Sequence, residues 1–268
     1  MPPRRSSQPV SLGKATDLAK DIAAMLGQLT GGEYGQPALA ELEAGERLVD
    51  ENLGNPVAFA HTVMDSYALA AGDLLYGASE TARQKHNLAF SSGAVARAAC
   101  EYAGLGWWLA EPGISVEARI ARTARLVNKS LAEARGLLDS AEQSRFQTEN
   151  HVLLTWAGKN LSRRETVPGP TDRFVAMNPD HGKRSYAYFS LLAHGDLIST
   201  VRIVAMQQAS NGEPEEDQVW RLMLACAHVL NLATRLSDLR DRRPADLISL
   251  FGLHQRYSDA MDAELSDQ

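Results

Sequence analysis

Apolar residues recur three and four positions apart along most of the chain, which is the spacing that predicts helices. In the first such segment, residues 12–29, the apolar side is formed by Leu18, Ile22, Met25 and Leu29. Similar spacing predicts further helices over residues 37–52, 56–75, 87–110, 116–138, 184–208, 215–240 and 245–257. No stretch of the sequence alternates apolar and polar residues in the manner of a strand bounded by hairpin turns. We therefore predict an all-α fold, a single multi-helix bundle of about seven or eight helices.

One long segment, residues 139–185, breaks this pattern, and we predict one long irregular loop there. It contains Pro168-Gly169-Pro170 and Asp180-His181-Gly182-Lys183, and both sequences are typical of turns. A loop of this length inside a compact domain is generally mobile or functional. Outside the helical bundle domain, residues 11–257, we predict a disordered tail at 1–10 and an acidic tail at 258–268.

The composition is that of an ordinary globular protein, with 44% hydrophobic and 22% charged residues. The net charge of -6 excludes a surface that binds nucleic acid over its whole extent, so RNA contact would need a local basic patch. The two cysteines, Cys100 and Cys226, each lie in an apolar helical segment, which fits a reducing compartment. The sequence has no signal-peptide pattern and no apolar run of about 18 residues. We therefore predict a cytoplasmic protein that does not enter a membrane.

The motifs of several enzyme classes are missing from the sequence. It has neither a phosphate-binding glycine loop nor a dinucleotide-binding Gly-x-Gly-x-x-Gly, and it has no nucleophile elbow. Paired Cys-x-x-Cys, His-Glu-x-x-His and Glu-x-x-His motifs are also missing, and the seven histidines are scattered. We therefore predict that the protein holds no metal and no cofactor.

The stretch from Arg184 to Ile198 is apolar on nearly every side if it is helical, which predicts a helix at the centre of the bundle. It contains His194, followed directly by Gly195. A buried histidine needs a hydrogen-bond partner unless it is itself the reason for a site. The candidate polar core or pocket combines this histidine with four residues from apolar helical segments: Arg97, Glu101, Tyr188 and Ser190.

Two interpretations of this polar set remain open. Arg97 and Glu101 are four residues apart, so they share a helix face and can pair directly. Tyr188 or Ser190 can provide a hydrogen bond to His194. The set is either a self-satisfied core network that fixes helix register, or the wall of a pocket in which His194 is the titratable group.

Basic residues also gather on the predicted helix 116–138. They lie off its apolar stripe and are Arg119, Arg122, Arg125 and Lys129. The first interpretation is a solvated polar face. The alternative is a local basic strip in which the three arginines contact phosphates.

Three segments, residues 95–112, 117–122 and 188–195, resemble an uncharacterised group of all-helical proteins common in actinobacteria. The shared features are an Arg97-x-x-x-Glu101 helix that ends in Trp-Leu and a later helix that contains Tyr188-x-x-Leu191-x-x-His194-Gly195. More distantly, the chain resembles HEPN-like helical domains linked to phage defence and toxin–antitoxin systems. The resemblance covers residues 90–205. Because the catalytic motifs are missing, we expect a non-catalytic or regulatory module of this HEPN-like type, a homodimer or partner-binding subunit; the resemblance implies a place in a phage-defence or stress system.

The HEPN superfamily also includes metal-independent ribonucleases, in which four to six residues separate an arginine from a histidine. Arg221 and His228 fit this spacing. In those enzymes the arginine neutralises phosphate and the histidine helps in proton transfer. A metal-independent ribonuclease that acts on RNA is therefore the first alternative function. The second alternative is a small-molecule sensor with a pocket between the helices at 87–110 and 184–208.

Overall fold

The structure, a computed structural model, describes residues 10–49, 54–84, 89–134, 139–160, 166–194, 201, 204–205, 215–240 and 244–266. Its labelled helices are α1 (Leu12–Thr30), α2 (Gln36–Glu46), α3 (Pro56–Ala82), α4 (Ala89–Leu109), α5 (Val116–Ala134), α6 (Ser140–Asn160), α7 (Pro170–Met177), α8 (Gly182–His194), α10 (Glu215–Leu239) and α11 (Pro244–Ser266). The described residues contain no extended strand, and Tyr34 and Arg240 form an isolated β bridge. The prediction of an all-α fold is confirmed, but there are more helices than the seven or eight predicted.

Several helices begin where the sequence places a capping residue. Ser11 accepts a hydrogen bond from the Lys14 amide at the start of α1. Asn55 caps α3 through its side-chain oxygen, and Pro56 occupies the first helical position. Ser115 accepts a hydrogen bond from the Ala118 amide at the start of α5. These side chains satisfy amide groups that have no partner inside their own helix, and so they fix the start of each helix.

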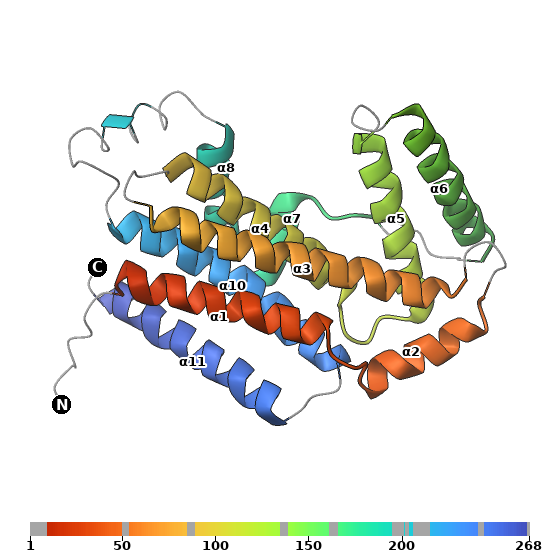
Figure 1. Cartoon of the computed structure of the whole chain (residues 1–268), viewed down its shortest axis with the longest axis horizontal. Coiled ribbons are helices and arrows are strands. Elements are labelled where there is room, and N and C mark those ends of the chain that lie inside the picture. Colours follow the sequence, from red (N-terminus) through yellow and green to blue (C-terminus); the bar gives the residue numbers. More distant parts are fainter. Residues whose placement is uncertain are drawn as a thin grey trace.

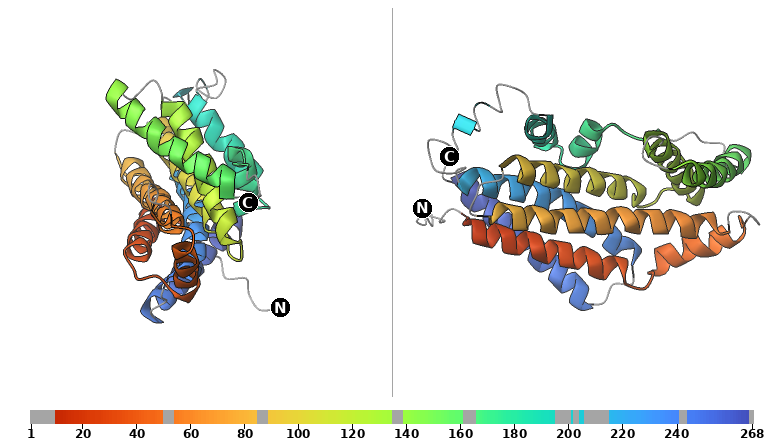
Figure 2. Two further views of the ribbon diagram at one scale, coloured as in Figure 1. Left: turned by 90° about the vertical axis from the view of Figure 1, so that its right-hand side faces the viewer. Right: turned by 45° about the horizontal axis from the view of Figure 1, so that its top comes forward.

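Four long helices, α1, α3, α4 and α10, pack against one another along the long axis of the molecule (Figure 1). α11 lies against α1 and α10, while α7 and α8 pack on α4. At one end, α2 and the pair α5 and α6 extend beyond these four helices (Figure 2). None of the helices in the described ranges is both long enough and apolar enough to cross a bilayer.

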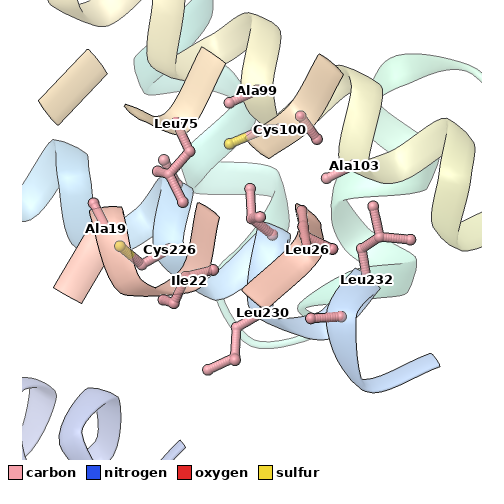
Figure 3. Close-up of a cluster of buried hydrophobic side chains, with 14 of the residues drawn as sticks. Ala19, Ile22, Leu26, Leu75, Ala99, Cys100, Ala103, Cys226, Leu230 and Leu232 are labelled. Atoms are coloured by element: carbon pink, nitrogen blue, oxygen red, sulfur yellow. The ribbon is translucent and has the colours of Figure 1, made fainter. Parts of the chain in front are cut away.

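Small side chains allow the four long helices to approach one another closely. The buried cluster in Figure 3 combines alanines and both cysteines with isoleucine and leucine side chains. Cys100 and Cys226 are free thiols in this cluster. Burial raises the pKa of both thiols, that of Cys226 to about 12. Both cysteines therefore act as small core residues rather than as nucleophiles.

Segment 139–185 differs most from its prediction, because much of it is helical rather than an irregular loop. It contains all of α6 and α7 and the first turn of α8. α6 packs on α5, and among its described side chains only Leu153 and Trp156 are buried. So few buried positions leave almost no apolar periodicity in the sequence, which is why the prediction missed this helix.

The ends of other elements also differ from their predictions. α3 continues to Ala82, past the predicted end at residue 75, because Ala78 and Ala82 are buried in the core and extend its packed face. α11 runs past Tyr257 to Ser266, and Met261 packs into the core. The predicted N-terminal tail lies, apart from its last residue, outside the described ranges.

Candidate functional site

Helix α8 lies on the outer side of α4, and the prediction that this stretch is surrounded by other helices is wrong. Its inner face carries Phe189 and Leu192, which are buried. Gly93 of α4 permits the close contact, because a Cβ atom there would lie 2.6 Å from Leu192 Cδ1. On the other side of α8, Arg184 and Leu191 remain exposed. One face of α8 is therefore fixed against α4, and the opposite face is available for a site.

A hollow of about 550 Å³ lies between this opposite face of α8 and the start of α10. Its lining residues are His181, Arg184, Ser185, Ala187, Tyr188, Leu191, Trp220 and Leu224. Small-molecule sites are typically hollows of about 300–1,000 Å³ with mainly apolar walls and a few polar groups. The volume and the lining of this hollow both fit that description.

The two ends of the lining differ in chemistry. Tyr188 and Trp220 are half-buried aromatic residues from opposite helices, and Leu224 beside them is buried. His181 and Arg184 bring basic groups at the first turn of α8, and none of the eight lining residues is acidic. The hydroxyl of Ser185 donates to the His181 carbonyl oxygen at 2.9 Å, so its proton is already used. The hollow therefore has apolar walls and one basic end.

The structure forms the pair that we predicted on α4. Arg97 Nε donates to Glu101 Oε1 at 2.7 Å, and both side chains are partly buried. The Arg97 guanidinium also lies over the ring of Tyr186, 5.4 Å from its centroid. Tyr186, which we did not predict, therefore brings α8 into contact with this pair.

The remaining members of the predicted polar set do not gather around the pair within the described residues. Tyr188 lies on the face of α8 that lines the hollow, and its ring meets Phe189 edge-on at 5.7 Å. Ser190 Oγ is buried without a hydrogen-bond partner. His194 is the last residue of α8, and its side chain lies outside the described residues. The structure thus divides the predicted set between the α4 contact and the hollow.

A buried arginine on α7, missed by the sequence analysis, lies near Glu101. Arg173 Nη1 donates to the Pro168 carbonyl oxygen at 2.5 Å, while its Nε is buried without a partner. Burial lowers the pKa of Arg173, and the negative charge of Glu101 partly opposes this shift. Arg173 packs against Gly104 of α4, so it joins α7 to that helix. Arg173 lies in the segment predicted as an irregular loop, where no apolar periodicity indicated a buried side chain.

The ribonuclease candidates Arg221 and His228 are both fully buried within α10. Arg221 Nη1 donates to Ser92 Oγ at 3.1 Å. His228 Nδ1 lies 2.8 Å from the Leu224 carbonyl oxygen, and its ring centroid lies 4.5 Å from that of Phe174. Burial lowers the pKa of His228, with the Leu224 bond opposing the shift. Neither side chain reaches a surface where RNA could bind.

The predicted basic strip of α5 does not face solvent as a unit. Arg122 is buried and donates to the Trp108 carbonyl oxygen at 2.6 Å, and it pairs with Glu111 at 2.6 Å. Arg119 is 1% exposed and donates to the Leu109 carbonyl oxygen. Only Arg125 of the three arginines is exposed. The prediction of a solvent-facing strip is therefore wrong for Arg119 and Arg122. Both side chains instead bind carbonyl groups at the end of α4, which have no partner inside that helix.

Arg119 also joins α5 to α2 and α3 through a partly buried carboxylate. Its Nε and Nη2 donate to the two carboxylate oxygens of Glu41 at 2.8 and 2.7 Å. His61 Nε2 lies 3.1 Å from Glu41 Oε2. Burial raises the pKa of Glu41, but the bonds from His61 and Arg119 outweigh it and hold the pKa below its ordinary value. This junction is structural, since every polar group of Glu41 is already paired.

The chain has no match among protein-family models, curated proteins or solved structures. The described residues contain no group of three or more histidine, cysteine or acidic side chains placed to hold a metal ion.

Of the eight lining residues, only Tyr188 was predicted as a site residue, and the missed ones include His181, Arg184 and Trp220. One signal was present. Arg184, Tyr188 and Leu191 are spaced i, i+4, i+7, which places a cation, an aromatic ring and an apolar side chain on one face. The same signal on α10 is the i, i+4 pair of Trp220 and Leu224.

Proposed function

We propose that the protein is a non-catalytic, regulatory helical module that binds a small molecule in the hollow between α8 and α10. The observation that carries this proposal is the lining of the hollow, where Tyr188, Trp220 and Leu224 form apolar walls beside one basic end. A small number of polar groups within an apolar wall is the usual composition of small-molecule sites. We predicted a sensor pocket between the helices at 87–110 and 184–208. The hollow instead lies on the other side of α8, toward α10.

The non-catalytic part of the proposal is supported by the state of the candidate catalytic groups. Arg221 and His228 are fully buried, and Arg119 is bound to Glu41 and to backbone carbonyls. A group that transfers a proton must come within hydrogen-bond reach of its substrate. These side chains instead hold helices together, so we assign them to stability.

The position of the hollow suits this role, because a ligand between α8 and α10 would touch two helices that otherwise contact each other little. Binding would tie α8 to α10 and so change the surface offered to a partner. The HEPN-like relationship, the homodimer and a place in a defence or stress system stay predictions.

A thermal-shift screen of small amphipathic molecules tests the proposal. A ligand at about a hundred times its Kd stabilises the folded state by about 2.7 kcal/mol, which raises the Tm of a chain of this size by roughly 5–10 °C. Ala187→Trp fills the hollow from an exposed helix position and should abolish the shift. Ala94→Trp is the matched control, since Ala94 is exposed on α4 and does not line the hollow.

The proposal fails if no molecule in the screen raises the Tm of the wild-type protein. It also fails if the molecules that raise it stabilise Ala187→Trp as strongly as Ala94→Trp. Circular dichroism of both variants should show unchanged helix content, because tryptophan at an exposed helix position costs only about 0.5 kcal/mol relative to alanine.

A further inference from the structure

We infer that the hollow selects a small organic anion, a carboxylate carried on an aromatic body. This inference rests on the proposed function and adds the chemical class of the ligand to it. Three features of the lining carry it: the balance of charge, the position of the basic end, and the aromatic walls.

The charge of the lining is one-sided. Among the lining residues that the structure describes, Arg184 and His181 are the basic side chains, and none carries a carboxylate. Within the described ranges, the Arg184 guanidinium makes no ion pair or hydrogen bond with another side chain. By contrast, Arg119 and Arg122 are each held by a glutamate. An arginine at the edge of a hollow without an acidic neighbour favours an anionic ligand, since guanidinium binds carboxylate through two parallel hydrogen bonds.

The basic end lies at one extreme of the hollow, and this position sets the direction of the ligand. Arg184 is one helical turn before Tyr188 and two before Leu191, so the three residues follow one another along a single face of α8. The amides of Gly182 and Ser185 are already bonded to Asn178 and His181 carbonyl oxygens. The ligand's charge therefore depends on the Arg184 and His181 side chains rather than on these two backbone amides.

The apolar walls determine the shape of the rest of the ligand. Tyr188 and Trp220 come from α8 and α10 respectively, with Leu224 one turn after Trp220. Aromatic rings prefer offset or edge-on contacts with other rings, and such contacts add to the effect of burial. A hollow of about 550 Å³ has room for one or two rings together with a short acid chain.

Calorimetric titration with phenylbutyrate and with its neutral amide, phenylbutyramide, tests this inference. The two probes have the same shape, and only the acid carries a charge. We expect the acid to bind the wild-type protein about fivefold to tenfold more tightly than the amide. Arg184→Gln should remove this preference and leave the affinity for the amide unchanged. Lys183→Gln is the matched control, because Lys183 is the exposed neighbour of Arg184 and does not line the hollow.

Two results would overturn the inference. If the amide binds as tightly as the acid, the hollow does not select an anion. If Arg184→Gln and Lys183→Gln weaken acid binding equally, only the overall charge of the protein matters. In either case, amide binding that is lost in Ala187→Trp would still support the proposed function. The inference about the ligand class can therefore fail while the proposed binding site stands. Absence of binding by both probes contradicts the anion inference, and the wider thermal-shift screen alone then decides the proposed function.

Discussion

The Glu41–Arg119 contact gives the sharpest stability prediction, because Glu41 of α2 binds the buried Arg119 of α5 and also contacts His61 of α3. The substitution Glu41→Gln keeps the shape of the side chain and removes its charge. Arg119 then stays buried, with an amide group in place of one of the carboxylate oxygens that it binds at 2.7 and 2.8 Å. Loss of one partner from a fully buried pair costs about 3–5 kcal/mol. Because the Glu41 side chain is 15% exposed, we expect a loss of about 2–4 kcal/mol.

Urea unfolding followed by circular dichroism measures this loss. With an m-value of about 3 kcal/mol per molar urea, a loss of 3 kcal/mol lowers the midpoint by about 1 M. The matched control is Asp21→Asn, which breaks the Arg256–Asp21 pair, whose side chains are 48% and 54% exposed. Exposed pairs contribute about 0.2–1 kcal/mol, so the control should lower the midpoint by roughly 0.3 M or less. If both variants lose the same small amount of stability, the Glu41 junction does not hold α2 and α5 in place, and our account of the α5 arginines is wrong.

Three further predictions concern other parts of the fold. Burial lowers the pKa of His228 in the folded protein, so this histidine binds a proton more tightly in the unfolded chain. The free energy of unfolding is therefore highest above the unfolded pKa of about 6.5 and falls as the pH drops below it. In urea titrations between pH 7 and 5, His228→Leu should weaken this pH dependence, and the exposed control His151→Gln should leave it unchanged. Gly93→Val should destabilise the protein by about 1–3 kcal/mol in the same assay, because the valine side chain would collide with Leu192. At the control position Gly158 a Cβ atom meets no neighbour, so Gly158→Val should cost less than about 1 kcal/mol. RNA incubated with the protein in EDTA should remain intact, and cleavage that is lost in His228→Ala would contradict the assignment of His228 to the core.

Local signals in the sequence were sufficient for the class of fold and for many element starts. The helices predicted to start at residues 12, 56 and 116 do start there, and each follows a capping side chain: Ser11, Asn55 and Ser115. The Arg97–Glu101 pair also followed from spacing alone, because residues four apart on a helix are neighbours whatever the tertiary structure. Such features depend on a few consecutive residues, so one sequence specifies them.

Features that depend on contacts between distant segments were not accessible from the sequence. Arg119 looked like part of a solvated face, yet its partner Glu41 comes from α2 and is 78 residues away. The spacing of Arg221 and His228 was compatible with a catalytic pair, but it carried no information on burial. The hollow was missed for the same reason, since its walls come from α8 and α10, and only the tertiary structure brings Tyr188 and Trp220 to one site.

The most direct test of the ligand site is the change in intrinsic tryptophan fluorescence when a stabilising, non-fluorescent ligand is added. Of the four tryptophans, only Trp220 is among the described lining residues of the hollow; Trp107 contacts Arg235 of α10, and Trp108 and Trp156 are buried, against α5 and within α6. Trp220→Phe keeps an aromatic wall but removes the reporter. We expect the wild-type fluorescence to change on binding and the change to disappear in Trp220→Phe at concentrations that calorimetry shows to be saturating. A change of the same size in Trp220→Phe would place the ligand elsewhere and would contradict the proposal that the hollow between α8 and α10 is the binding site.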